Sequence, residues 1–215
     1  MSGPSAERGR QGGVAALILA AGASRRMGSP KALLPWGKGS LLRHVAEVAL
    51  ASPCRETFVV LGAEGRRVAD ELRGLAVHAI ENESWERGMG SSLATGIRAV
   101  EAGEDPAEPW RAVLILLCDQ PAVTPELLGR LISVAREGAR AEAPRTMVAC
   151  RYAGSLGPPA LFARSLFGEL RALDGDRGAK ALLLRDPTAV ASVEFAEGAL
   201  DLDTPEDYDR ARRAP

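Results

Sequence analysis

Cysteine and histidine are scarce in this 215-residue chain, and their scarcity argues against several kinds of site. The three cysteines, Cys54, Cys118 and Cys150, are odd in number and far apart, which indicates neither a disulfide framework nor a zinc-binding spacing. We expect each of them to be a small buried apolar residue. His44 and His78 lie in no catalytic motif, and no Ser-His-Asp or Cys-His arrangement is evident.

Long apolar runs and a strong net charge are also missing. No apolar run reaches the ~18 residues of a membrane-spanning helix, and the polar N-terminal segment lacks the apolar core of a signal peptide. The formal net charge of −1 gives no overall basic field for nucleic acid or an anionic membrane. We therefore expect a cytoplasmic protein without nucleic-acid or membrane partners. We also expect a disordered tail over residues 1–12 and a single domain over residues 13–215.

What the sequence does contain is a buried strand followed by a cationic loop. Residues 14–21 are an unbroken apolar run, which is typical of a strand buried on both faces. The chain then supplies Gly22, Ser24, the pair Arg25-Arg26 and Lys31. Glycine lets the backbone approach a ligand closely, and exposed N–H groups with cations suit a polyphosphate. The spacing matches neither the dinucleotide loop nor the Walker loop, and an arginine-rich surface turn is the alternative.

Apolar periodicity predicts alternating strands and helices along the rest of the chain. We expect residues 32–36 to be extended and residues 154–162 to form a loop. The expected strands cover residues 14–21, 56–62, 75–80, 112–118, 147–152 and 190–195. The expected helices cover residues 40–51, 64–72, 91–101, 124–137, 165–173 and 179–185, and a last helix begins at residue 204. This order predicts an α/β fold with a parallel sheet and right-handed crossovers.

A carboxylate follows the most apolar of these strands. Asp119 comes directly after residues 112–118, which we expect at the centre of the sheet. The carboxyl ends of parallel strands share one edge, so Asp119 is expected beside the cationic loop. A carboxylate there is a candidate Mg²⁺ ligand, because this cation prefers oxygen donors and bridges to phosphates. The alternative is that Asp119 only caps the turn before Pro121.

Two segments carry a resemblance to a known family. The pattern Leu19-Ala20-Ala21-Gly22-x-Ser24-x-Arg26-Met27-Gly28-x-x-Lys31 resembles the signature of the MobA-like nucleotidyltransferases. Leu117-Cys118-Asp119-Gln120-Pro121 resembles the metal-binding aspartate motif in the form seen in the cytidylyl branch. The sequence Ala20-Ala21-Gly22 favours that branch, since the guanylyl branch usually reads Leu-Ala-Gly-Gly from position 19. The resemblance covers residues 17–208 and implies a three-layer Rossmann-like (GT-A-like) fold with a mostly parallel central sheet.

The resemblance also implies roles for individual residues. Those implied for nucleotide binding are Leu19, Ala20, Ala21, Gly22, Ser24, Arg26, Lys31, Gly90, Ser91 and Ser92. Arg26, Lys31 and Asp119 would be catalytic, and Asp119 and Asp203 would hold Mg²⁺. Gly157, Phe162, Asp176 and Arg177 would lie on the acceptor side. The alternatives are a helix cap for the serines and a helix start flanked by Asp201 and Asp203. For Gly157 and Phe162 the alternative is a plain loop-to-strand junction, and for Asp176 and Arg177 it is an ordinary turn.

The implied reaction is transfer of a cytidylyl group from CTP to the phosphate of molybdopterin, the organic part of the molybdenum cofactor. Lys31, Arg26 and Mg²⁺ would offset the charge of the triphosphate, and a phosphate acceptor needs no general base. Three alternatives remain. They are guanylyl transfer to the same acceptor, transfer to another phosphorylated small molecule, and a non-catalytic maturation partner that hands the cofactor to a molybdenum hydroxylase.

Overall fold

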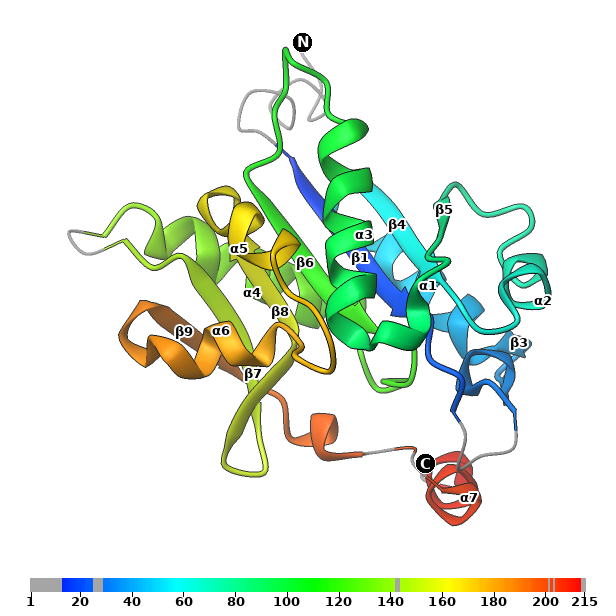
Figure 1. The fold of residues 1–215 in the computed structure, drawn as a ribbon. Helices are drawn as coiled ribbons and strands as arrows, with labels where there is room; N and C mark the ends of the chain where they lie inside the picture. Colours follow the sequence, from blue (N-terminus) through cyan, green and yellow to red (C-terminus); the bar gives the residue numbers. More distant parts are fainter. Residues whose placement is uncertain (1–12, 25–28, 142–143, 201, 203, 214–215) are drawn as a thin grey trace, which may run out of the picture.

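A seven-stranded sheet forms the centre of the protein in a computed structural model, which describes residues 13–24, 29–141, 144–200, 202 and 204–213 (Figure 1). Its strands are β1 (Val14–Ala20), β4 (Glu56–Leu61), β5 (His78–Glu81), β6 (Ala112–Leu117), β7 (Met147–Tyr152), β8 (Ser155–Ala163) and β9 (Val190–Glu194). The strand order is β5-β4-β1-β6-β8-β7-β9. In this sheet β8 runs against the other strands, which are mutually parallel. The expected mostly parallel α/β sheet is confirmed.

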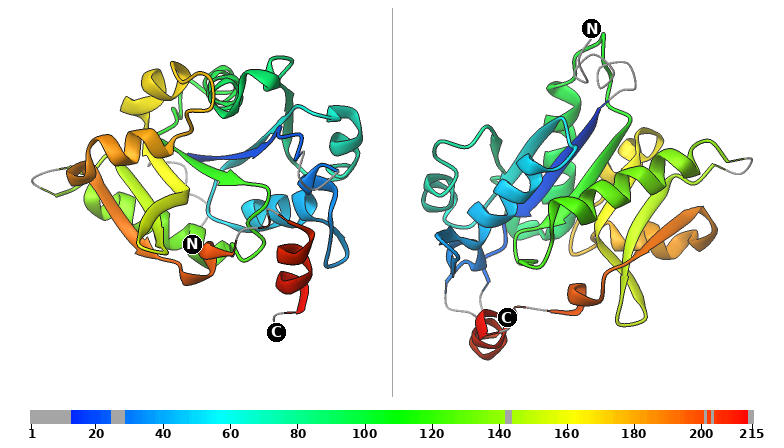
Figure 2. Two further views of the ribbon diagram at one scale, coloured as in Figure 1. Left: turned by 60° about the horizontal axis from the view of Figure 1, so that its bottom comes forward. Right: turned by 180° about the vertical axis from the view of Figure 1, so that it is seen from behind.

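Helices cover both faces of the sheet and give three layers (Figure 2). One face packs against α1 (Leu41–Ala51), α2 (Gly65–Asp70) and α4 (Pro125–Gly138), and the other against α3 (Met89–Ala102), α5 (Phe167–Arg171) and α6 (Lys180–Arg185). Successive side chains of a strand point to opposite faces. In β1, Ile18 joins the α1 side and Leu17 joins the α3 side, and both are fully buried. This two-sided burial explains why β1 is apolar throughout.

The last helix, α7 (Pro205–Arg213), packs away from the sheet. It lies near the short hairpin of β2 (Pro35–Trp36) and β3 (Gly39–Ser40). Leu202 and Ala211 form a small apolar cluster with Leu41 at the start of α1. The Tyr208 hydroxyl donates a hydrogen bond to the Pro35 carbonyl, which ties the end of the chain to its first third.

The prediction of a loop over residues 154–162 was wrong for residues 155–162, which belong to β8. Glycines and prolines indicated a loop, and proline cannot donate to a strand ladder. The ladder between β7 and β8 shifts register between Ala149, which faces Ala160, and Cys150, which faces Gly157. Pro158 and Pro159 fall in that irregularity, so the ladder needs no donors from them.

Three smaller expectations also needed correction. Residues 32 and 33, expected to be extended, lie in a 3-10 turn over Lys31–Leu33. Helix α3 begins at Met89, with Gly88 at the N-cap, so neither Ser91 nor Ser92 caps it. β5 begins at His78 rather than at residue 75. Among the described residues, no helix is long and apolar enough to cross a membrane.

Candidate active site

The carboxyl ends of β1 and β6 meet at the centre of the sheet. Leu19 faces Leu117 in the ladder, and the Cys118 N–H donates to the Leu19 carbonyl over 3.2 Å. The strand order reverses here, because β4 and β5 lie on one side of β1 and β6 lies on the other. Ligands of open α/β sheets bind outside the strand ends at such a reversal.

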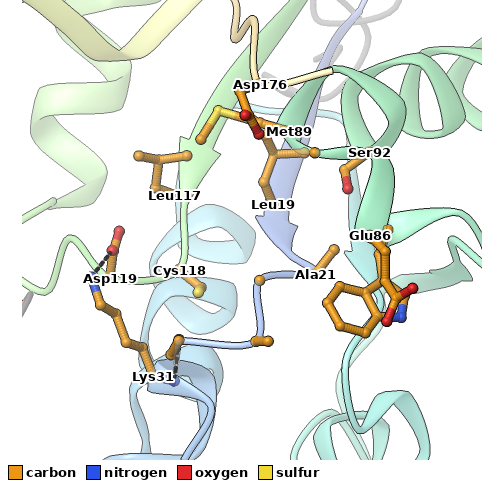
Figure 3. A pocket seen from close by; sticks show the side chains of 15 residues that line it. Leu19, Ala21, Lys31, Glu86, Met89, Ser92, Leu117, Cys118, Asp119 and Asp176 are labelled. Carbon is orange, nitrogen blue, oxygen red and sulfur yellow. Dashed lines mark hydrogen bonds and ion pairs between the residues drawn. The ribbon is translucent and has the colours of Figure 1, made fainter. Parts of the chain in front are cut away.

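A cleft of about 660 Å³ opens at this position (Figure 3). The ends of β1 and β6 form its floor, and the short turn Trp85–Arg87, the start of α3 and the loop at residue 176 contribute to its walls. Its lining comprises Leu19, Ala21, Gly22, Ala23, Ser24, Lys31, Trp85, Glu86, Gly88, Met89, Ser92, Leu117, Cys118, Asp119 and Asp176. The cleft therefore gathers residues from distant parts of the chain at the expected edge of the sheet.

Lys31 and Asp119 form an ion pair in the cleft. Lys31 Nζ lies 2.9 Å from Asp119 Oδ2, and the two side chains are 13% and 23% exposed (Figure 3). This partial burial makes the pair stronger than a fully exposed one. The carboxylate is accessible to a cation and the ammonium to an anion, so the pair can take part in binding a charged ligand.

A hydrogen bond joins the two described ends of the loop after β1. Ser24 has φ of 48°, a left-handed conformation that is uncommon outside glycine. Its hydroxyl oxygen accepts a hydrogen bond from the Lys31 N–H over 3.0 Å. This bond brings residues 24 and 31 together at the cleft. Arg26 lies outside the described residues, as does Asp203.

A buried amide supports the start of α3. Asn82 follows β5 directly and is 3% exposed. Its Nδ2 donates to the hydroxyls of both Ser91 and Ser92 over 3.0 Å. Ser92 lines the cleft, whereas Ser91 turns its hydroxyl toward the Ser84 and Gly88 carbonyls. The two serines therefore differ in their access to a ligand.

Gly90 has a packing role in this structure. A Cβ added at Gly90 would lie 2.6–2.7 Å from backbone atoms of Asp174, and the Gly90 N–H donates to the Gly175 carbonyl over 2.8 Å. An Arg87–Asp174 ion pair of 2.6 Å adds to this docking. The docked loop places Asp176 in the cleft lining, while Arg177 is exposed.

The other predicted residues lie beside the cleft rather than in its lining. Ala20 is buried on the α1 side of the sheet. Gly157 is buried where a Cβ would collide with Tyr152. Phe162 is fully buried on the α3 side and lines a second, smaller cavity. The sequence alone could not place Gly157 and Phe162, because β8 was interpreted as a loop.

Two side chains hold the segment around Asp119. His44 Nε2, on α1, lies 3.0 Å from the Pro121 carbonyl, and since a carbonyl only accepts, the ring nitrogen is the donor. The Gln120 side chain is buried, and its Nε2 donates to the Pro158 carbonyl over 3.0 Å. Its Oε1 has no hydrogen-bond partner among the described residues. These contacts hold the two residues that follow Asp119 in place.

The cleft thiol is not suited to nucleophilic attack. Burial raises the pKa of the Cys118 thiol, and the neighbouring Asp119 carboxylate raises the pKa further. The thiol therefore stays protonated near neutral pH, and only the thiolate is nucleophilic.

The donor set at the cleft suits a hard cation bound together with phosphates. Asp119 supplies carboxylate oxygen, whereas no cluster of three or more His, Cys, Asp or Glu able to hold a metal occurs in the part of the chain that the structure describes. Mg²⁺ commonly binds through one or two carboxylates, substrate phosphates and water. A site of that kind fits Asp119.

Sequence reasoning missed several residues of the site. Asn82, Trp85, Glu86 and Met89 all line the cleft or support it. Asn82 carried a usable signal, since it is a polar residue directly after a strand and at the edge where the site forms. The others acquire their places only because the Trp85–Arg87 turn folds over the strand ends.

The chain is similar to proteins that are already known. The model of the MobA-like NTP transferase domain matches residues 16–190. The chain is 32% identical to the purine catabolism protein PucB of Bacillus subtilis (92% of this chain, 95% of PucB). It is 30% identical to nicotine blue oxidoreductase of Paenarthrobacter nicotinovorans (90% of this chain, 93% of the relative). It is 26% identical to molybdenum cofactor cytidylyltransferase of Escherichia coli (91% and 94%).

Solved structures agree with these relatives. Rv0371c from Mycobacterium tuberculosis is 30% identical, with a TM-score of 0.80 over 94% of this chain and 98% of that one. A manganese complex of Rv0371c is 28% identical, with a TM-score of 0.72 over 92% and 97%. The match to the domain model covers most of the sequence, including both strand ends that form the cleft. The chain therefore belongs to the MobA-like NTP transferase family and is a nucleotidyltransferase.

Proposed function

We propose that this nucleotidyltransferase transfers the cytidylyl group of CTP to the phosphate of molybdopterin, giving molybdopterin cytosine dinucleotide and pyrophosphate. The observation that carries the proposal is the Lys31–Asp119 pair at the strand reversal. It joins the two motifs that resemble the cytidylyl branch in one cleft.

Different residues of the cleft bind different parts of the triphosphate. The Lys31 ammonium stabilises phosphate charge, and backbone groups around Gly22 let the phosphates approach closely. Attack at the α-phosphorus places charge on its oxygens and on the departing pyrophosphate, so alignment and charge stabilisation account for most of the catalysis. The acceptor phosphate is already an anionic nucleophile, which fits the structural role of His44 at Pro121.

Asp119 would hold Mg²⁺ together with the phosphates, and the cation would supply charge neutralisation for the transferred group. The manganese complex of a relative supports a divalent cation in this fold. Asp203 is proposed as a second carboxylate ligand from the resemblance, and Arg26 as a further phosphate ligand.

The choice of cytosine is supported by the sequence at the end of β1. This chain has Leu19-Ala20-Ala21-Gly22 where the guanylyl branch usually reads Leu-Ala-Gly-Gly, and Ala21 lines the cleft. Ser92, held by Asn82, offers a hydroxyl on the wall formed by α3, where a base or ribose contact is available.

The test offers each of the four α-labelled ribonucleoside triphosphates with Mg²⁺ and molybdopterin. Label in a pterin dinucleotide from CTP alone is the expected result. Label from GTP would contradict the base assignment and leave the chemistry standing. CTP binding without any transfer would contradict the acceptor.

A different acceptor is the second candidate function. It is favoured by the higher identity to PucB and nicotine blue oxidoreductase, at 32% and 30%, than to the cytidylyltransferase, at 26%. A phosphorylated small molecule other than a pterin would use the same donor site. Offering sugar phosphates and polyol phosphates with labelled CTP separates the two acceptors.

A further inference from the structure

A second cavity of about 190 Å³ lies on the α3 side of the sheet. β6 and β8 contribute Ile115, Ala160 and Phe162 to its lining, α3 contributes Leu93, and α6 contributes Leu183. All five of these residues are buried and carry only carbon and hydrogen in their side chains. The cavity therefore has an apolar interior, in contrast to the charged cleft beside it.

The cavity adjoins the cleft. Leu19, Met89 and Leu117 line both spaces. Figure 3 shows these three side chains grouped on one part of the cleft wall, with the Lys31–Asp119 pair on another. A ligand in the cavity would therefore lie next to a molecule bound in the cleft.

Met89 forms a movable boundary between the two spaces. Its side chain is 45% exposed despite being large and apolar. Its sulfur would lie 2.7 Å from a Cβ added at Gly178, so the missing side chain of that glycine makes room for it. A methionine side chain is unbranched and adapts its shape, so it can move aside without disturbing the backbone.

We propose that this cavity binds a small molecule through an uncharged, apolar single ring that enters past Met89. An apolar cavity of ~150 Å³ lined by Leu, Ile and Phe stays dry and binds benzene, which is a comparable size. A ring with nitrogen or oxygen atoms would lose hydrogen bonds to water on entering and gain none from the buried hydrocarbon side chains. Lys180 also lines the cavity, but its side chain is exposed. The site is thus distinct from any that holds a pterin or a cytosine.

The experiment measures the binding of two probes, toluene and pyrimidine, to the full chain by saturation-transfer NMR in the absence of nucleotide. Toluene should bind saturably and at least about 10-fold more tightly than pyrimidine, because only toluene avoids desolvating ring nitrogens. The chemical shift of the Met89 methyl group should change with toluene concentration and follow the same saturation curve. Equal binding of the two probes, or no saturable toluene binding, would overturn the proposal.

Ala179, just before α6, and Ala181, within α6, give a matched pair of variants. Ala179 lines the cavity, whereas Ala181 is exposed. Ala179→Phe should weaken toluene binding at least 10-fold, and Ala181→Phe should leave it within 2-fold of the parent. Toluene binding in Ala179→Phe equal to that of the parent would contradict the site.

If Ala179→Phe does not fold, Met89→Trp replaces it, because position 89 is half exposed and the larger ring would block the entrance. Since these assays contain no nucleotide, their outcome is independent of the proposed cytidylyl transfer.

Discussion

Lys31 and Asp119 are 88 positions apart in the chain, yet Lys31 Nζ and Asp119 Oδ2 lie 2.9 Å apart in the cleft. Neighbouring strands β1 and β6 produce this contact, because the two residues follow their carboxyl ends. The pairing balances one positive and one negative charge before any ligand binds. A variant at Lys31 can therefore be compared with a variant at Asp119.

Replacing Asp119 with Asn keeps the shape and removes the charge. We expect kcat for nucleotidyl transfer to fall by about 10²–10³, the range measured when one preorganised electrostatic contact is removed. Steady-state kinetics over a Mg²⁺ titration provide the measurement. Glu137→Gln, an exposed carboxylate on α4, is the control and should change little. A fully active Asp119→Asn enzyme would exclude Asp119 from the metal site.

Lys31→Ala should lower turnover strongly without unfolding the protein. The lysine side chain is 13% exposed and lines the cleft, so the loss falls on phosphate binding rather than on the core. Turnover and thermal melting should be measured on the same sample. Lys38→Ala changes an exposed lysine and should behave like the parent. Unchanged turnover in Lys31→Ala would remove Lys31 from the mechanism.

Asn82→Ala should reduce the free energy of unfolding by about 1–3 kcal/mol, because it leaves buried hydroxyls at the start of α3 without their amide partner. The lost contacts include the two hydrogen bonds from Asn82 Nδ2 to Ser91 and Ser92 and the one that Asn82 Oδ1 accepts from the Ser84 N–H. Urea denaturation measures the change, with Glu83→Ala as the exposed neighbouring control. Equal stability of the two variants would show that the buried amide contributes nothing.

Gly90→Ala and Gly168→Ala should have opposite effects. At Gly90 a Cβ would lie 2.6–2.7 Å from the Asp174 backbone, so the loop carrying Asp176 must shift, at a cost of about 1–3 kcal/mol in stability. At Gly168, in α5, a Cβ meets nothing within 4 Å, and alanine favours a helix by up to about 1 kcal/mol. Denaturation of both variants tests this, and equal changes would contradict the close packing at Gly90.

Stability should decline at alkaline pH because of the cysteines. Burial raises the pKa of Cys54 from 9.0 to about 11 and the pKa of Cys150 from 9.0 to about 12. The unfolded chain therefore loses thiol protons first, so the free energy of unfolding falls as the pH rises from about 9 toward about 11. Urea denaturation across this range measures the slope. Cys54→Ala should have a shallower slope, and an identical slope would show that Cys54 does not titrate differently on folding.

The amino-acid order determined much of this protein by itself. An unbroken apolar run must be buried on both faces, so β1 and β6 were predictable as central strands, and polar residues directly after them had to lie at one edge. Asp119 could be chosen on that ground, and Lys31 as a cation of the loop that follows β1.

The tertiary structure decided what depends on long-range packing. β8 pairs between β6 and β7 although its prolines indicate a loop, since a register shift accommodates them. Gly90 fits against Asp174, and Asn82 holds two serines, only because α3 docks where it does. The apolar cavity is likewise formed by α3, α6 and three strands together. Such features depend on how surfaces meet in space, which no local pattern in the sequence specifies.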